Sequence, residues 1–75
     1  MPKDYYIVIF PSTHLALRAE RVAQEAGIPV IMIPVPRHIS TDCNMGMRVS
    51  SERRDSLRAL LSSEGIECTF MLWRK

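Results

Sequence analysis

The chain of 75 residues contains two cysteines, three glycines and no long apolar run. Two cysteines cannot build the disulfide framework that holds many small secreted proteins together. No stretch approaches the roughly 20 apolar residues of a membrane span. No charged segment followed by an apolar run opens the chain, as one would in a secretory signal. We therefore expect a cytoplasmic protein with reduced thiols and no membrane span.

The net charge is also small. Ten basic residues stand against eight acidic ones, which gives a formal charge of +2, and the basic residues are scattered along the chain. Binding of nucleic acid through bulk electrostatics needs a concentrated positive surface. The sequence therefore predicts no nucleic acid among the partners of this protein.

Several patterns that carry catalysis or cofactor binding are missing. The sequence has no pair of neighbouring carboxylates suited to acid/base chemistry, no glycine-rich phosphate loop and no standard zinc-ligand spacing. We therefore predict neither a metal nor a cofactor. One candidate nucleophile in 75 residues favours a protein that is not an enzyme, although it does not decide the question.

Hydrophobic periodicity predicts four strands and two helices. The strands are expected over 5–10, 29–35, 45–49 and 66–73, where apolar runs or alternation occur. The first helix is expected to begin at Ser12 or Thr13 and the second at Ser50 or Ser51, because serine and threonine cap helix N-termini. Glycines 27 and 65 should end these helices. Pro34 cannot donate a backbone hydrogen bond, which places its strand at a sheet edge.

The same periodicity predicts which residues face the core. Apolar residues at helical spacing mark the buried faces of the two helices: Leu15, Ala19, Val22, Ala23 and Ala26 in the first, and Leu57, Leu60 and Leu61 in the second. In the last strand, alternation points one set inward: Ile66, Cys68, Phe70 and Leu72.

The order β-α-β-β-α-β predicts a ferredoxin-like fold of the α+β class, formed by one domain over residues 1–75. Right-handed crossovers place both helices on one face of a four-stranded antiparallel sheet. The other face then stays open, with Met71, Trp73 and one set of side chains from the first strand on it. An exposed apolar face of this kind indicates an interface, and we expect either a homodimer through it or another partner bound to it.

The candidate functional site is the loop that contains Cys43. Arg37 and His38 lie close to Cys43 in the sequence, and neighbouring cations favour the reactive thiolate form. In the predicted topology this loop reaches the end of the sheet where Ser12 and Thr13 begin the first helix, whose amides suit an anion. In the alternative interpretation, Cys43 is a small residue in a turn and the basic pair is solvated surface.

Three other features of the sequence are weaker candidates for a functional role: Cys68, a possible metal site and Gly46. Cys68 should point into the core and act as a small hydrophobic residue. A metal site from His14, His38 and Cys43 matches no standard zinc spacing. Gly46 indicates either a bulge or a close approach of backbone.

Two segments resemble a known family. They read Phe10-Pro11-Ser12-Thr13-His14 and Pro34-Val35-Pro36-Arg37-x-Ile39-Ser40-x-x-Cys43, and they are similar to the selenium/sulfur (Se/S) carrier protein-like family. The resemblance implies that Cys43 holds sulfur or selenium as a persulfide or selenosulfide. It also implies a donor, such as a cysteine desulfurase, and an acceptor protein as partners. Asn44 follows Cys43 where the family usually has glycine.

Two other functions remain open from the sequence. The same helix N-terminus and loop would serve a non-catalytic regulatory module that binds a small anion or other ligand, with Ser12, Thr13 and Arg37 more important than Cys43. A purely structural partner subunit would need only the open apolar face of the sheet.

Overall fold

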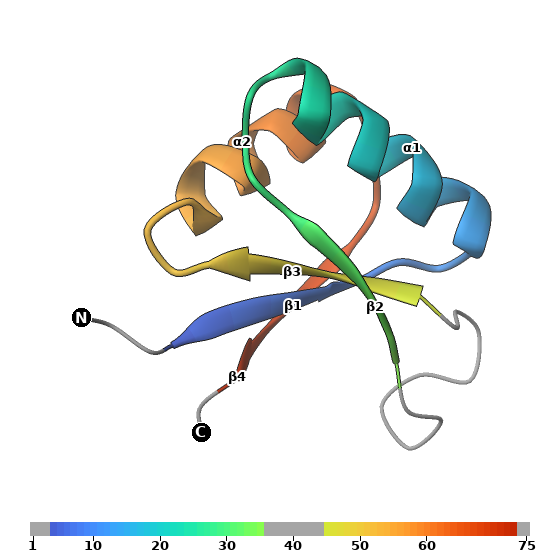
Figure 1. Cartoon of the computed structure of the whole chain (residues 1–75). Coiled ribbons are helices and arrows are strands. Elements are labelled where there is room, and N and C mark those ends of the chain that lie inside the picture. The colour runs from blue at the N-terminus through green and yellow to red at the C-terminus, as the bar shows by residue number, and fades with distance from the viewer. Residues whose placement is uncertain (1–3, 36–44, 74–75) are drawn as a thin grey trace.

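The computed structural model describes residues 4–35 and 45–73, which form six elements of secondary structure (Figure 1). Their order along the chain is the predicted one: β1 (Tyr5–Ile9), α1 (Thr13–Glu25), β2 (Ile31–Pro34), β3 (Met45–Ser50), α2 (Arg54–Ser63) and β4 (Thr69–Trp73). The helices and strands alternate as β-α-β-β-α-β.

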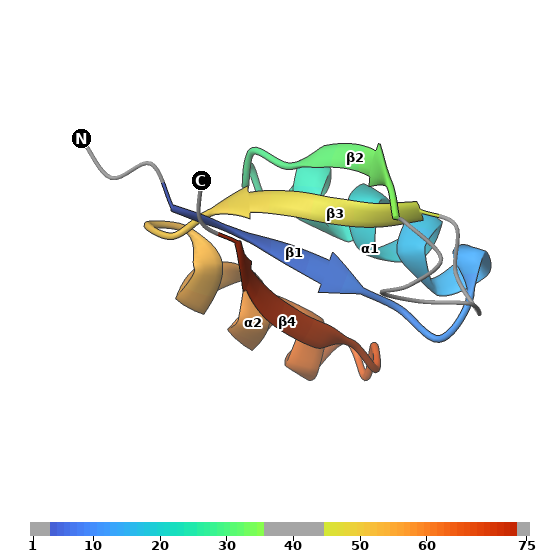
Figure 2. The ribbon, with the colours of Figure 1, turned by 90° about the horizontal axis from the view of Figure 1, so that it is seen from below.

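The four strands form one antiparallel sheet in the order β2-β3-β1-β4. Both helices lie on the same face of this sheet, so the molecule has two layers (Figures 1 and 2). α1 packs against α2 and against β3. The predicted α+β ferredoxin-like fold is confirmed.

The core lies between the helices and the inner face of the sheet. β1 and β3 are the central strands, and alternate residues of both are almost fully buried: Val8, Met47 and Val49, with Phe10 directly after β1. The helices contribute Ala16, Ala19, Ala23, Leu57 and Leu61. The small alanines let α1 lie close to the sheet, and the leucines of α2 fill the core beside them.

Some predicted positions were wrong in detail. Ala16 is buried in α1, whereas Ala26 lies after the helix and is exposed. α2 begins later than expected, with Arg53 as its N-cap and no side-chain hydrogen bond there. The chain makes a turn between Ser50 and Arg53, whose amide donates to the Ser50 carbonyl at 3.0 Å. Neither Ser50 nor Ser51 is the cap, because this turn separates β3 from the helix.

The edge strands are shorter than their apolar runs. β2 begins at Ile31 rather than at residue 29, and β4 begins at Thr69 rather than at residue 66. β2 lies at the edge of the sheet, as Pro34 required. Leu72 belongs to the inward-facing set of β4, but it is 46% exposed because the other edge of the sheet is only partly covered by α2.

Both helices end in the same hydrogen-bonded motif. After α2, the amide of Gly65 donates to the Ser62 carbonyl at 3.1 Å and the amide of Ile66 to the Leu61 carbonyl at 2.9 Å. These two bonds define a Schellman motif, which needs a left-handed residue. Gly65 has φ +68° and Gly27, at the end of α1, has φ +76°. The predicted glycine stops are confirmed.

The outer face of the sheet is mainly apolar and has no helix over it. Its apolar and aromatic side chains come from three strands and the residue after β2: Tyr5, Ile7, Ile9, Ile31, Ile33, Val35 and Met71. Ser50, Arg48 and Thr69 lie on the same face, because they pair with Tyr5, Ile7 and Ile9, and the Arg48 guanidinium lies 4.1 Å from the centre of the Tyr5 ring. Ile31 is 58% exposed, whereas Ile7 and Val35 are covered by their neighbours in the sheet. The side chain of Trp73 lies outside the described residues. The homodimer through this face stays a prediction.

Candidate functional site

The site predicted from the sequence was expected at the end of the sheet where β1 leads into α1. Ile9, the last residue of β1, pairs with Gly46, and Pro34 at the end of β2 pairs with Met45 at the start of β3. Residues 36–44 therefore connect two strand ends that lie beside the start of α1 (Figure 2). The sequence predicted that the connection between β2 and β3 begins and ends at the same end of the sheet as the N-terminus of α1. The pairing of Ile9 with Gly46 and of Pro34 with Met45 agrees with this prediction.

Ser12 is the N-cap of α1. Its backbone is extended, with φ −153° and ψ 157°, and its hydroxyl accepts a hydrogen bond from the Leu15 amide at 3.3 Å. Its carbonyl accepts from the Ala16 amide at 3.2 Å. A cap of this kind satisfies one of the amides that a helix start leaves free. The structural role of Ser12 is thus established, and the expected binding role of Ser12 and Thr13 stays a prediction.

The remaining residues of the predicted site are Arg37, His38 and Cys43, and all three lie outside the described residues. The structure therefore does not test whether they gather around the start of α1. The metal site considered from His14, His38 and Cys43 is untested for the same reason. Within residues 4–35 and 45–73, no three histidine, cysteine, aspartate or glutamate residues gather in a group that could hold a metal ion.

Gly46 fixes how the two strand ends meet. A Cβ atom at this position would lie 2.6 Å from Val35 Cγ2, 3.2 Å from the Val8 carbonyl oxygen and 3.3 Å from Ile7 Cγ2. The side chain of Val35 therefore occupies the space that a side chain at position 46 would need. Gly46 keeps its ladder partners on both sides. Of the two interpretations of Gly46, the structure supports the close approach.

Comparison with protein families gives one match. The family described as "Putative Se/S carrier protein-like" matches residues 5–72, which is nearly the whole chain and includes every element of the fold except the last residue of β4. The chain belongs to this family. No curated protein and no solved structure matches it. The resemblance seen in the two short segments is therefore confirmed over the full fold of this Se/S carrier-like chain.

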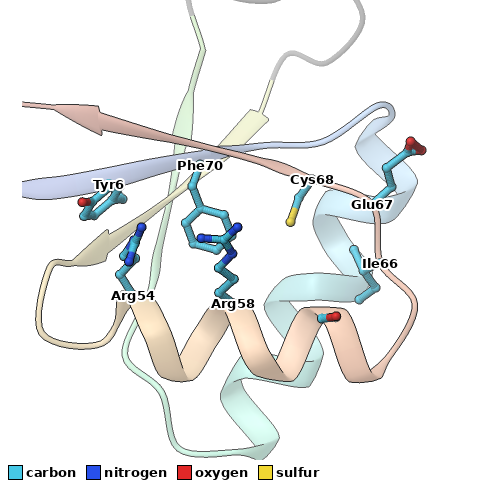
Figure 3. A pocket seen from close by; sticks show the side chains of 8 residues that line it. Tyr6, Arg54, Arg58, Ile66, Glu67, Cys68 and Phe70 are labelled. Carbon is cyan, nitrogen blue, oxygen red and sulfur yellow. The ribbon is translucent and has the colours of Figure 1, made fainter.

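A groove in this Se/S carrier-like chain lies between α2 and β4, and the sequence reasoning did not predict it. It has a volume of about 400 Å³ and is lined by eight residues: Tyr6, Arg54, Arg58, Ser62, Ile66, Glu67, Cys68 and Phe70 (Figure 3). Arg54, Arg58 and Ser62 follow one another at intervals of four along one side of α2. That spacing was the available signal, because it places two arginines on neighbouring turns of the same helix.

Cys68 lies at the groove rather than in a sealed core. Its inward direction is confirmed, since it packs beside the core cluster, but it is only half-buried. Burial raises the pKa of the Cys68 thiol above its ordinary value, while the positive charge of Arg58 lowers it by a smaller amount. The thiol is therefore mainly protonated at neutral pH, and the expectation of a purely structural cysteine is incomplete because its side chain reaches an open groove.

No helix in the described part of the chain is long and apolar enough to cross a membrane.

Proposed function

We propose that this chain carries sulfur or selenium on Cys43, as a persulfide or selenosulfide, between a donor and an acceptor protein. The observation that supports this most strongly is membership of the Se/S carrier-like family over residues 5–72, a range that includes Cys43. The proposal places the exchange in the cytoplasm, where thiols are kept reduced.

The chemistry requires little from the carrier. The Cys43 thiolate attacks the terminal sulfur of a persulfide on a donor such as a cysteine desulfurase. A bond forms between that sulfur and Cys43, the bond to the donor cysteine breaks, and the donor thiolate leaves. The exchange has no net oxidation or reduction, because one thiolate and one persulfide give another thiolate and another persulfide.

The strand pairing supports a role for the start of α1 in this exchange. The residues that flank 36–44 lie at the end of the sheet where β1 leads into α1: Met45 pairs with Pro34, and Gly46 pairs with Ile9. A helix N-terminus favours negative charge close to it. In the proposal these amides, together with Arg37 and His38, stabilise the thiolate and the anionic persulfide.

Mass spectrometry of two cysteine variants tests the loading step. The Cys68→Ala protein, incubated with a cysteine desulfurase and cysteine, should gain the mass of one sulfur atom that a reducing agent removes. The matched Cys43→Ala protein should gain none. Supplying selenocysteine in place of cysteine shows whether selenium is loaded as well. Loading of the Cys43→Ala protein alone would contradict the assignment of the carrier thiol.

The pKa of Cys43 tests the electrostatic part. A helix terminus and a neighbouring cation each contribute about 0.3–1 kcal/mol, so the pKa should lie roughly one unit below the ~8.5 of a free thiol. Arg37→Ala should raise this pKa and slow loading, as measured by thiolate absorbance against pH in the Cys68→Ala background. Arg53→Ala is the control, because Arg53 follows β3 at the opposite end of the sheet.

The same measurements separate the carrier from the non-catalytic anion-binding module. If Cys43 is never loaded while Arg37→Ala abolishes binding of a small anion, the regulatory module is the better explanation.

A further inference from the structure

The groove between α2 and β4 has the features of a binding site for a small organic molecule. Its volume of about 400 Å³ falls within the roughly 300–1,000 Å³ of pockets that hold such ligands. One wall is apolar and is formed by Tyr6, Ile66 and Phe70, with the two aromatic rings 6.5 Å apart in an edge-to-face arrangement. The opposite wall carries the side chains of α2 (Figure 3).

Two guanidinium groups enter this groove from neighbouring turns of α2. Arg54 and Arg58 both extend from the helix toward the sheet (Figure 3). Like charges at this spacing repel each other and destabilise a helix. An anion bound between the two groups would remove that repulsion.

The donors of these arginines are not all used. Arg54 pairs with Asp55 at 2.6 Å through Nη1 and stacks 4.9 Å from the centre of the Tyr6 ring. Its Nε is buried and has no hydrogen-bond partner within the described residues, and a buried donor without a partner costs free energy. Arg58 makes no hydrogen bond or ion pair with any residue in the described ranges.

The acidic residue of the groove does not neutralise them. Glu67 lines the rim, but its side chain is directed away from both arginines (Figure 3), and no ion pair joins it to either of them within residues 4–35 and 45–73. Asp55, which does pair with Arg54, is 87% exposed on the solvent side. Arg58 therefore has no acidic partner within these residues, and Arg54 has only the exposed Asp55.

We infer that this groove binds a small organic anion, with a carboxylate between Arg54 and Arg58 and an apolar group against Tyr6 and Phe70. The planar guanidinium matches the geometry of a carboxylate. The thiol of Cys68 lines the same groove near Phe70 and Ile66 (Figure 3), where a ligand held by Arg58 would restrict access to it. This site is separate from Cys43 and does not depend on the proposed carrier function.

Titration with phenylacetate, followed by NMR, tests this inference. The NMR chemical shifts of the Arg58 Nε and of the Cys68 and Phe70 amides should change with phenylacetate concentration and reach a plateau. Arg58→Gln should weaken binding about tenfold, which corresponds to the loss of one charge-assisted hydrogen bond. Arg58 is exposed, so this variant should fold normally.

Three comparisons are designed to overturn the inference. Arg53→Gln removes the same charge from an exposed residue outside the groove, and it should leave the affinity for phenylacetate unchanged. A loss of affinity equal to that of Arg58→Gln would mean that the attraction is non-specific. Phenylacetamide has the same shape without the charge, and equal binding would exclude a carboxylate site. Sulfate has no apolar group, and equally tight binding of sulfate would exclude an organic ligand.

Alkylation of Cys68 locates the ligand independently. In a Cys43→Ser protein, Cys68 is the remaining cysteine of the chain, so its reaction with iodoacetamide can be followed alone. Saturating phenylacetate should slow this reaction, because the ligand covers the thiol. An unchanged rate at saturation would show that the ligand is bound elsewhere and would overturn the assignment of the groove.

Discussion

Replacing Gly46 by alanine should destabilise the fold through one defined clash. The new methyl group would lie 2.6 Å from Val35 Cγ2, well inside van der Waals contact, and 3.2 Å from the Val8 carbonyl oxygen. The Val8 backbone cannot move away easily, because β1 is a central strand paired on both sides. Overpacking of this kind costs about 1–3 kcal/mol.

A gain in the unfolded state partly offsets that cost. Alanine has less conformational freedom than glycine in the unfolded chain, which contributes about 0.4–1 kcal/mol in favour of folding. The difference spans about 0–2.6 kcal/mol, and because the contact with Val35 Cγ2 is as short as 2.6 Å we expect a net loss of about 1–2 kcal/mol for Gly46→Ala. For a domain of this size each kcal/mol corresponds to roughly 4–8 °C in Tm.

The origin of the clash can be tested with a second substitution. Val35→Ala removes two methyl groups, each worth about 0.8 kcal/mol when buried, but it also removes the atom that Gly46→Ala would strike. The double variant should therefore lose less stability than the sum of the two single variants, with a coupling free energy of about 1 kcal/mol. Urea unfolding followed by circular dichroism measures all four free energies of unfolding.

Additive losses, within about 0.5 kcal/mol, would refute the reasoning, because they would show that the two side chains do not meet. A Gly46→Ala protein as stable as the wild type would refute it as well.

Further results are expected at three positions, Ser12, Gly65 and Cys68. Ser12→Ala should lower the free energy of unfolding by about 1 kcal/mol through loss of the hydrogen bond to Leu15, and Ser12→Asp should retain it; equal losses in thermal melts would argue against the cap. Gly65→Ala should cost about 1 kcal/mol because φ is +68°, and Gly65→Asn should cost less; the reverse order in urea unfolding would contradict the left-handed motif. In a Cys43→Ser protein, Arg58→Gln should raise the pKa of Cys68 further, as read from the alkylation rate against pH. Since the folded protein holds the thiol proton more tightly than the unfolded chain, stability should fall as pH rises above about 8.5; no fall above this pH, or a lower pKa in Arg58→Gln, would contradict the assignment.

Local sequence patterns were enough to predict the order of the elements and most of the core. Tyr5 to Phe10 and the leucines of α2 carry strong local patterns, and the burial of these segments on folding leaves few alternatives to a two-layer α+β arrangement. The glycines at the helix ends and the proline at the edge strand act through their own backbone chemistry, so their roles were also evident locally. Two short motifs were enough to suggest the family, and the match over residues 5–72 showed the membership.

Tertiary structure alone decided the details that depend on packing between distant segments. The closure of Val35 over Gly46 involves two strands, and the start of α2 is set by a turn after β3 rather than by a serine cap. Cys68 and Leu72 follow the predicted alternation, yet both remain accessible because α2 does not extend over the whole of β4. The groove with Arg54 and Arg58 exists for the same reason: alternation fixes which way a side chain points, but only the placement of the helix across the sheet decides whether it is sealed or faces an open space.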